Sequence, residues 1–360
     1  MYSYIVTPQS YIVVEKTDEP QKNQQPGGER AQTDWVCEGN ESDFPRRRLG
    51  NAMGGDQYFD SYGDINVHRL MLEDAPRTLA YKQALESLGD QIRGKVVLDV
   101  GAGTGILSLF AAKCGASRVY AVEASDIAAH TKEVVSENML DGVIKVLQCK
   151  VEDADIGEKV DVIVSEWMGF YLFHESMLDS VLYARDRWLK PGGLILPRTA
   201  KLYASPINME KHCNDRFGFW TDVYGFSMQT FIAAEAQAML RAPVIEQVAK
   251  EMLLSEPQLV KEVDCATAKQ EDLRSFTQDL KFTARKEGIC HGFCFWFVCQ
   301  FENGVTLSTA PSKPQTHWKQ ATVMLPEMLQ SIPDKVRFDC KVGFVQSKGN
   351  ERQYQITLEM

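Results

Sequence analysis

The chain has 360 residues, of which 44% are hydrophobic and 24% charged, and its formal net charge is −10. These values are typical of a globular protein, and the length predicts two domains or one core with a large appendage. The acidic balance argues against direct nucleic-acid binding and favours basic partners. No apolar run is long enough to span a membrane and the N-terminus lacks a signal-peptide pattern, so we expect no membrane partner.

Nine cysteines are present, and none of them forms a paired C-x-x-C spacing. Cys290, Cys294 and Cys299 lie in or beside a strand-like aromatic run, where core thiols are expected rather than zinc ligands. The sequence therefore predicts no metal site. Free thiols are typical of a reducing compartment, so we expect a location in the nucleus, the cytoplasm or both.

Residues 1–54 show little periodicity and are predicted to be mostly disordered. A short apolar patch, Tyr11–Val14, and a basic cluster, Arg46–Arg48, lie within this segment. The stretch Gln57–Ser87 then has the apolar spacing of helices, with a break near Gly63. We expect these helices to cover the sheet that follows them in the chain.

From Lys95 the pattern alternates between apolar strands and amphipathic helices, which predicts a doubly wound parallel sheet. We therefore assign residues 55–198 to an α/β domain that includes the cover helices. The expected strands are Lys95–Val100, Arg118–Glu123, Val143–Gln148, Val160–Val164 and Leu194–Pro197, the last one preceded by a turn at Pro191–Gly193.

After Pro197 short strand-like runs replace this alternation and predict an antiparallel β-barrel domain over residues 199–360. Within it, the stretch from Met209 to about Gln237 is helical and aromatic. Such an apolar excursion is either a satellite core or a contact for another subunit. The expected strands are Ala200–Tyr203, Leu259–Val263, Phe293–Phe301, Thr322–Leu325, Val336–Phe338 and Gln353–Ile356.

A glycine-rich turn follows the first expected strand, with glycines at positions 101, 103 and 105. Its G-x-G-x-G spacing differs from the G-x-G-x-x-G of dinucleotide binders, because residue 106 is Ile. With Asp99 before it, the turn is similar to the S-adenosylmethionine-binding motif of class I methyltransferases. Glu123, at the end of the second strand, is placed to bind ribose hydroxyls. A tight turn without a ligand is the alternative.

The loop Ser165–Ser176 follows the fourth expected strand, at the edge where open α/β sheets bind ligands. It carries Glu166 and Glu175, one near each end. If the loop returns on itself, both carboxylates face one small space, and two like charges held close favour a cation between them. A guanidinium fits that space better than an ammonium does. Two solvated surface acids are the alternative.

Four stretches together resemble the protein arginine methyltransferase family, over about residue 56 to the end. They are Tyr58–Tyr62, the glycine-rich turn, the Ser165–Glu175 loop and Thr316–Trp318. The runs Phe173–Leu178 and His291–Phe293 are most similar to one subgroup of type I members. The resemblance implies a class I methyltransferase (Rossmann-like) domain followed by a β-barrel with a helical dimerisation arm.

The resemblance also implies a reaction and its participants. The protein would transfer methyl groups from S-adenosylmethionine to arginine in basic protein segments such as histone tails and Gly/Arg-rich sequences. It would make monomethylarginine and asymmetric dimethylarginine. The arm at residues 209–237 would form a homodimer.

Site roles come from the same resemblance, position by position. Catalytic roles are implied for Glu166, Glu175, Asp74 and His317. Cofactor contacts are implied for Arg77, Gly101, Gly103, Glu123, Val151, Glu152, Met168, Tyr58 and His68. Substrate contacts are implied for Tyr62, Met71, Met177 and Trp318, and methionine at both 71 and 177 resembles the enzymes that make asymmetric dimethylarginine.

The chain departs from the family pattern at its end. Family members usually continue into one more strand after the one that matches Gln353–Glu359, so we expect an unpaired barrel edge. This keeps open a second function, that of a catalytically weak cofactor-binding protein that pairs with an intact relative. A small-molecule methyltransferase is a third reading, against which the two glutamates and the Thr316–Trp318 loop argue.

Overall fold

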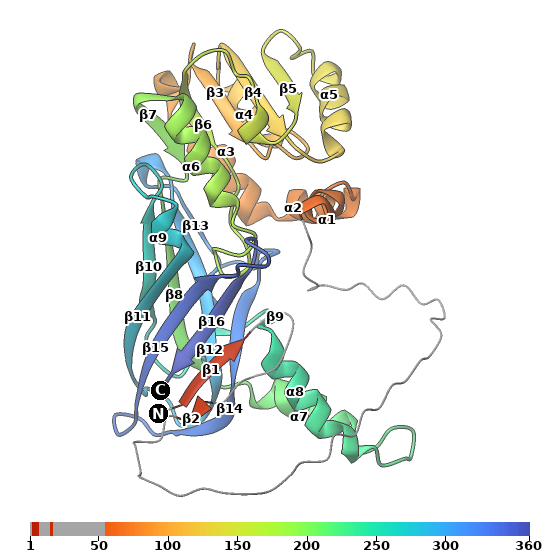
Figure 1. Cartoon of the computed structure of the whole chain (residues 1–360), viewed down its shortest axis with the longest axis vertical. Helices are drawn as coiled ribbons and strands as arrows, with labels where there is room; N and C mark the ends of the chain where they lie inside the picture. The colour runs from red at the N-terminus through yellow and green to blue at the C-terminus, as the bar shows by residue number, and fades with distance from the viewer. Residues whose placement is uncertain (1, 7–14, 17–54) are drawn as a thin grey trace, which may run out of the picture.

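The computed structural model describes residues 2–6, 15–16 and 55–360 of the chain. An α/β domain lies at one end of the molecule and a β-barrel domain at the other, with a helical arm projecting from the barrel (Figure 1). The predicted combination of a doubly wound domain and an antiparallel barrel is confirmed. No helix within these residues is long and apolar enough to cross a membrane.

The α/β domain is built on a parallel sheet with the strand order β5-β4-β3-β6-β7. The chain adds two strands on one side of β3 and then crosses to its other side, so the strand order reverses between β3 and β6. Ligands of open α/β sheets bind at such a reversal, beyond the carboxyl ends of the strands. The strands are β3 (Val96–Val100), β4 (Arg118–Glu123), β5 (Ile144–Gln148), β6 (Val160–Val164) and β7 (Leu189–Leu196).

Strand β7 differs from the expectation of a turn followed by a shorter strand. Pro191, Gly192 and Gly193 are part of the strand, and the pairing with β6 shifts register after Val160. A Cβ atom at Gly193 would lie 2.6 Å from the Leu189 side chain and 2.9 Å from the Asp161 carbonyl oxygen. Glycine therefore allows the irregular strand to stay close to its neighbour.

Helices cover both the sheet and its carboxyl edge. The leading helices are separated by a turn at Gly63 and by Asp74, whose side chain caps the third of them by accepting from the backbone N–H of Arg77 at 3.0 Å. The helices are α1 (Gly55–Ser61), α2 (Ile65–Glu73), α3 (Ala75–Ser87), α4 (Ile106–Lys113), α5 (Ile127–Glu137) and α6 (Met177–Trp188).

The barrel consists of two antiparallel sheets, with strand orders β10-β8-β12-β14-β9 and β11-β15-β16-β1-β2. All six runs predicted for this domain coincide with strands, although Phe301, Val336 and Gln353 lie one residue outside them, whereas β9, β11 and β13 were not predicted. The strands are β8 (Thr199–Ile207), β9 (Val244–Glu246), β10 (Gln258–Asp264), β11 (Ser275–Thr283), β12 (Gly288–Gln300), β13 (Thr306–Ser308), β14 (Gln320–Ser331), β15 (Arg337–Gln346) and β16 (Tyr354–Glu359), and a short helix, α9, covers Glu271–Arg274.

Strand β16 is paired on both of its edges, in contrast to the expected open edge. It pairs with β15 on one side and with β1 (Tyr2–Val6) on the other, in the register Ser3 to Glu359 and Val6 to Ile356. A two-residue strand, β2 (Glu15–Lys16), pairs with β1. The N-terminal segment thus supplies the backbone partner of the second edge of β16. The predicted apolar patch, Tyr11–Val14, and basic cluster, Arg46–Arg48, lie outside the described residues.

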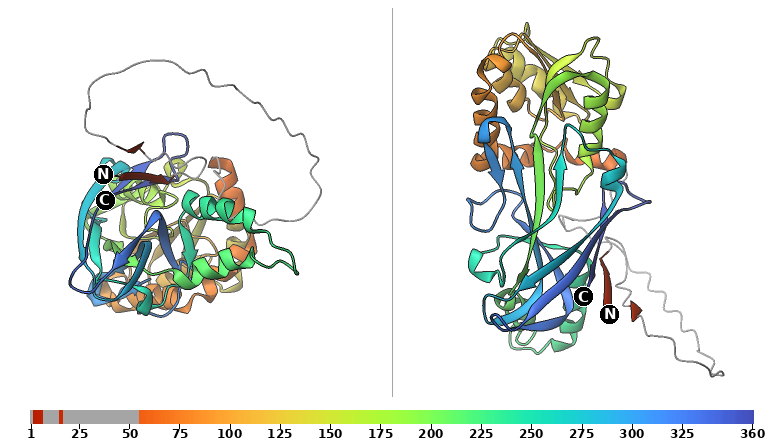
Figure 2. Two further views of the ribbon diagram at one scale, coloured as in Figure 1. Left: turned by 90° about the horizontal axis from the view of Figure 1, so that it is seen from below. Right: turned by 90° about the vertical axis from the view of Figure 1, so that its left-hand side faces the viewer.

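The arm consists of α7 (Glu210–Phe219) and α8 (Ile232–Arg241) and projects away from the barrel (Figure 1 and the left view of Figure 2). A small core joins its base to β8, β12 and β14, but its tip exposes large apolar side chains. Tyr224 is 97% exposed and Phe226 69% exposed. Exposed aromatic side chains of this size are typical of a protein contact surface.

Candidate active site

Three glycines shape the turn after β3. Gly101, Gly103 and Gly105 have φ values of +71°, +54° and +84°, a region that residues with a side chain rarely adopt. A Cβ atom at Gly101 would clash with the Met177 Sδ-methyl, and one at Gly103 would lie 3.3 Å from the His68 ring. The turn therefore needs glycine, and it leaves bare backbone facing the leading helices.

Glu123 ends β4 beside this turn and is almost fully buried. Its two carboxylate oxygens accept from the backbone N–H of Gly103 at 2.8 Å and of Ser125 at 2.7 Å. These bonds hold an acceptor in a fixed place beside the glycine-rich turn. A carboxylate has about four lone-pair positions, so capacity remains for a ligand hydroxyl.

Asp99 lies below the turn, in β3, and is fully buried. Burial raises its pKa to about 7, although the Ser108 hydroxyl donates to Oδ2 at 2.7 Å. Ser108 lies on α4, so this bond connects the strand before the turn to the helix after it. The sequence did not single out Ser108, because a buried serine on a helix has no distinctive pattern.

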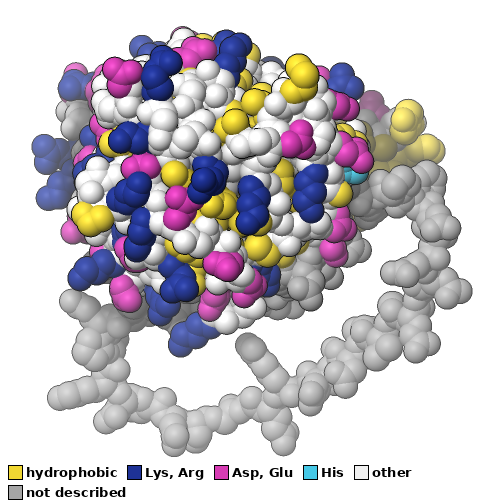
Figure 3. All heavy atoms as spheres, turned by 90° about the horizontal axis from the view of Figure 1, so that it is seen from above, with side chains coloured by type: hydrophobic (Ala, Val, Ile, Leu, Met, Phe, Trp, Pro, Cys, Tyr) yellow, Lys and Arg dark blue, Asp and Glu magenta, His cyan; other side chains and the backbone are white. Residues whose placement is uncertain are grey.

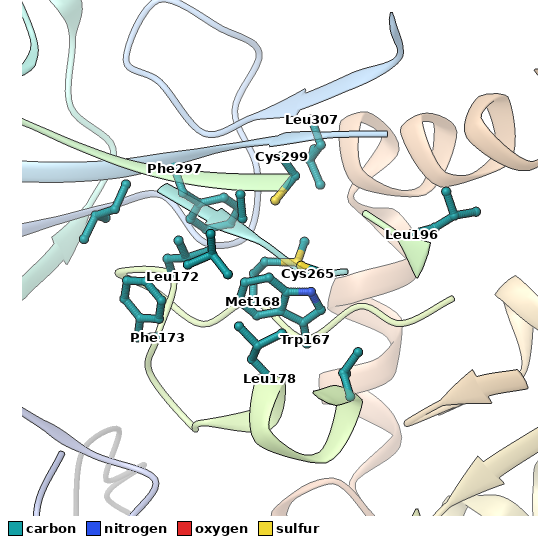
Figure 4. Packing of buried hydrophobic residues seen from close by; sticks show 14 of the residues in the cluster. Trp167, Met168, Leu172, Phe173, Leu178, Leu196, Cys265, Phe297, Cys299 and Leu307 are labelled. Atoms are coloured by element: carbon teal, nitrogen blue, oxygen red, sulfur yellow. The ribbon is translucent and has the colours of Figure 1, made fainter. Parts of the chain in front are cut away.

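The loop after β6 returns on itself, as the guanidinium hypothesis requires. Gly169 and Leu172 exchange backbone hydrogen bonds of 3.0 and 2.9 Å. Apolar side chains of the loop, among them Trp167, Leu172 and Phe173, pack into the core that the two domains share (Figure 4). This packing fixes the two ends of the loop, where the glutamates lie.

Glu175 receives two phenol hydrogen bonds from the first leading helix and the turn after it. Tyr58 donates to Oε2 at 3.0 Å and Tyr62 donates to the same oxygen at 2.7 Å. Burial and the nearby Glu175 carboxylate raise the pKa of both phenols, so they stay protonated as donors. Burial lowers the pKa of His174, which keeps the adjacent ring neutral.

Glu166 binds a guanidinium of its own chain. Arg77 Nε and Nη2 both lie 3.1 Å from Glu166 Oε2, and Nη1 donates to the Met71 carbonyl oxygen at 3.1 Å. The other carboxylate oxygen accepts from the Met168 backbone N–H at 3.2 Å. The structure thus places Arg77, expected to bind the cofactor, against Glu166, one of the two glutamates expected to bind a guanidinium.

The predicted pair of Asp74 and His317 is present. Asp74 Oδ2 accepts from the His317 backbone N–H at 2.8 Å and lies 2.7 Å from Nδ1 of the ring. Trp318 follows, is buried, and donates from Nε1 to the Met168 carbonyl oxygen at 2.8 Å. The barrel loop therefore contacts both α3 and the loop that carries Glu166.

The remaining predicted residues lie around the same edge of the sheet. His68 Nε2 lies 2.7 Å from the Tyr62 carbonyl oxygen, and its ring faces Gly103. Val151 is buried after β5, whereas Glu152 is exposed and accepts from the Ser180 hydroxyl at 2.7 Å. Among the residues that the structure describes, no cluster of His, Cys, Asp or Glu could hold a metal ion.

A second residue of the site region, besides Ser108, was not predicted from the sequence. Arg352, in the hairpin between β15 and β16, contacts the backbone of Glu175 and the ring of Tyr58. The separation of 177 residues between Arg352 and Glu175 leaves no local sequence pattern that could reveal this contact.

Comparisons with known proteins agree with this geometry. A family model described as "Arginine methyltransferase oligomerization subdomain" matches residues 198–360, and one described as "Methyltransferase domain" matches residues 97–193. The probable protein arginine N-methyltransferase 6 of Arabidopsis thaliana is 41% identical, over 84% of this chain and 78% of its own length. The chain belongs to the protein arginine methyltransferase family.

Other members of the family give the same result. Protein arginine N-methyltransferase 6 of Xenopus tropicalis is 45% identical over 77% of this chain and 83% of its own length. A crystal structure titled "PRMT6-SAH" has a TM-score of 0.71 and 33% identity, covering 82% of this chain and 99% of that one. The Trypanosoma brucei PRMT1 enzyme-prozyme complex with AdoHcy has a TM-score of 0.76 and 34% identity, covering 83% of this chain and 94% of that one. The predicted resemblance of the chain to one subgroup of the family is confirmed, because the Arabidopsis thaliana and Xenopus tropicalis relatives are both named as protein arginine N-methyltransferase 6.

Proposed function

We propose that this protein transfers methyl groups from S-adenosylmethionine to guanidinium nitrogens of arginine in proteins. The observation that carries the proposal is the placement of Glu166 and Glu175 on one returning loop at the carboxyl edge of the sheet, next to the glycine-rich turn. Glu166 already binds a guanidinium there, that of Arg77. A site that fits one guanidinium is chemically suited to another.

The residues present fit the adenosylmethionine cofactor. The turn at Gly101–Gly105 offers bare backbone, since side chains at two of its glycines would meet Met177 and His68. Glu123 is a buried acceptor at the end of β4, where ribose hydroxyls bind in this class of sheet. Arg77, His68, Met168, Val151 and Glu152 would contact the rest of the cofactor, whose sulfonium supplies an electrophilic methyl group.

The two glutamates account for the chemistry on the substrate side. Arginine keeps its proton at neutral pH, because its pKa exceeds about 12. Two carboxylates orient the guanidinium and draw its positive charge toward the nitrogens that they contact, which leaves electron density on the nitrogen to be methylated. Holding that nitrogen in line with the methyl group lowers the entropic part of the activation barrier to the single displacement.

The Asp74–His317 pair is the proposed route for the proton that leaves after transfer. Burial alone would raise the pKa of Asp74, but hydrogen bonds from the His317 ring and from the backbone N–H groups of Arg77 and His317 outweigh it and lower the pKa. Asp74 is therefore an anion that holds the His317 ring in place. Glu175 is the alternative acceptor of the proton.

The finer assignments are part of the same proposal. In this proposal Met71 and Met177 would limit the space around the substrate guanidinium, which would give asymmetric dimethylarginine as the final product. The aromatic tip of the arm supports a homodimer, and the net charge of −10 supports basic substrates such as histone tails and Gly/Arg-rich segments. All eight cysteines in the described part of the chain are free thiols, which supports a nuclear or cytoplasmic location.

The catalytically weak alternative depended on an open barrel edge. Strand β1 occupies that edge of β16, so the observation that favoured this alternative is no longer present. On the face of the α/β domain opposite the barrel, Lys and Arg side chains are interspersed with Asp and Glu (Figure 3). This mixed surface gives no support to nucleic-acid binding.

The decisive experiment is transfer of a radiolabelled methyl group from S-adenosylmethionine to histone and Gly/Arg-rich peptides. Incorporation into arginine is expected, and mass spectrometry of the product then distinguishes monomethyl, symmetric and asymmetric dimethyl forms. Absence of incorporation, together with cofactor binding in calorimetry, would instead support the weak partner protein. Methylation of small molecules alone would support the third reading.

A further inference from the structure

Glu175 has a backbone conformation that is unusual for a residue with a side chain. Its φ is +77°, and the next residue, Ser176, has a φ of +51°. Two successive residues in the left-handed region cost energy, of the order of 1 kcal/mol or more each, and persist only where the surroundings enforce them. The segment that carries one of the two key carboxylates is therefore held by contacts from outside the loop.

Arg352 supplies these contacts to Glu175 from the β15–β16 hairpin of the barrel. Its carbonyl oxygen accepts from the Glu175 backbone N–H at 2.7 Å, and its guanidinium Nη1 donates to the Glu175 carbonyl oxygen at 3.0 Å. Both backbone groups of Glu175 are thus bonded to a single residue. These two bonds fix the orientation of the peptide units on either side of the Glu175 Cα atom.

The same guanidinium contacts the residue that holds the Glu175 side chain. Arg352 Cζ lies 3.6 Å from the centre of the Tyr58 ring, the phenol of which donates to Glu175 Oε2 at 3.0 Å. A planar guanidinium stacked on an aromatic ring contributes about 0.5 to 2 kcal/mol, more where water is excluded. Tyr58 is buried, so the stacked pair restrains the first leading helix against the hairpin.

Neighbouring bonds keep the hairpin itself in place. The Ser176 hydroxyl donates to the Glu351 carbonyl oxygen, and Gln346 donates to the same oxygen at 2.8 Å and to the Ser176 hydroxyl at 3.1 Å. The hairpin therefore rests on the C-terminal end of the Ser165–Ser176 loop through several side chains. Arg352 is the member of this group that contacts both the backbone of Glu175 and the side chain that orients its carboxylate.

We propose that Arg352 is a positioning residue for methyl transfer, which joins the barrel, the first leading helix and Glu175 so that the Glu175 carboxylate faces the substrate guanidinium. Arg352 acts through Tyr58 and Glu175 and need not touch the substrate. This inference rests on the proposed function. Lysine cannot replace arginine here, because an ammonium group lacks the planar face that stacks on Tyr58 while donating sideways to a carbonyl.

The test compares Arg352→Ala and Arg352→Lys with the wild-type protein, using a Gly/Arg-rich peptide and S-adenosylmethionine. A misplacement of about 1 Å costs up to about 100-fold in rate, so we expect kcat to fall about 10- to 100-fold in both variants. The KM of the peptide should change less, because the rest of the binding surface is intact. Arg337→Ala is the matched control, since Arg337 is exposed at the opposite end of β15, and it should leave kcat unchanged.

Coupling to Tyr58 separates positioning from a general loss of stability. Tyr58→Phe keeps the ring and removes its hydroxyl, so Tyr58→Phe and Arg352→Lys should be strongly non-additive in kcat when combined. Additive effects, or an Arg352→Lys variant with wild-type kcat, would overturn the proposal. If the alanine variant does not fold, the kcat of the lysine variant and the double-mutant cycle of Tyr58→Phe with Arg352→Lys still test the proposal. A wild-type protein without any transfer to arginine peptides would instead count against the proposed function.

Discussion

The Asp74 carboxylate lies 2.7 Å from His317 Nδ1, although 243 residues separate the two in the chain. A carboxylate only accepts, so the Nδ1 proton lies between them and Nε2 is the ring nitrogen left for proton transfer. The bond also crosses the domain boundary, from the start of α3 to a loop of the barrel. The two domains are thereby connected at the site itself.

Asp74→Asn tests this pair. Asparagine still caps α3, but it removes the negative charge that faces the His317 ring. We expect kcat to fall roughly 10- to 100-fold, as for other groups that support proton transfer. His317→Gln should have a similar effect, and the double variant should be little worse than either single one. Methylation assays give kcat for the two single variants and the double variant. Full additivity of the two single effects would contradict a functional pair.

Glu166→Gln and Glu175→Gln test the guanidinium clamp. Each change keeps the shape of the side chain but removes one of the two charges that we propose bind and polarise the substrate arginine. We expect each variant to lose at least about 100-fold in methyl transfer while it still binds S-adenosylmethionine in calorimetry. Glu137→Gln, at an exposed position on α5, is the matched control and should remain active. Normal turnover in either site variant would refute the clamp.

Gly103→Arg tests the glycine-rich turn. The φ of +54° disfavours any side chain, and a Cβ atom would already lie 3.3 Å from the His68 ring. An arginine side chain would have to enter the space in front of the turn, so we expect cofactor affinity to fall by at least about 100-fold. Gly142→Arg is the control, because open space surrounds that glycine. Calorimetry that gives equal affinities for the two variants would show that the turn does not bind the cofactor.

Asp99→Asn tests the buried carboxyl below the turn. The pKa of Asp99 is raised to about 7, against an ordinary value of about 4, so the folded protein binds a proton that the unfolded chain releases between these values. Stability from this group is therefore fully present below about pH 4, is lost as the pH rises to about 7, and stays constant above that. The Asp99→Asn variant lacks this contribution to the pH dependence of stability, because its amide does not titrate.

Urea unfolding at several pH values between 5 and 8 measures the effect of Asp99. The difference in stability between Asp99→Asn and wild type should shift in favour of the variant as the pH rises toward 7. Asp279→Asn, at an exposed position on β11, serves as the control and should follow the wild-type curve. Identical pH dependence of all three proteins would mean that Asp99 is not buried as a protonated acid.

Much of the site could be predicted from the chain, because its motifs are local. Gly101–Gly105 follows one apolar strand, and the segment with Glu166 and Glu175 follows another. The apolar pattern alone therefore placed both segments in loops at the carboxyl edge of the sheet. The resemblance then assigned Tyr58, Tyr62, Asp74 and His317 to the same site. The pairing of β16 with the N-terminal strand was not predicted, since an edge strand of five residues has no sequence signal that names its partner.

The sequence by itself determined which residue types are available for chemistry: glycines where the backbone must turn, and the acids that we propose bind a cation. Tertiary structure decided which of them meet. The reversal of strand order places the loops after β3 and β6 side by side, and the barrel then brings His317 to Asp74 and Arg352 to Glu175. These contacts join residues far apart in the chain, and they form because packing of the shared core, rather than any local preference, fixes the distance between the two domains.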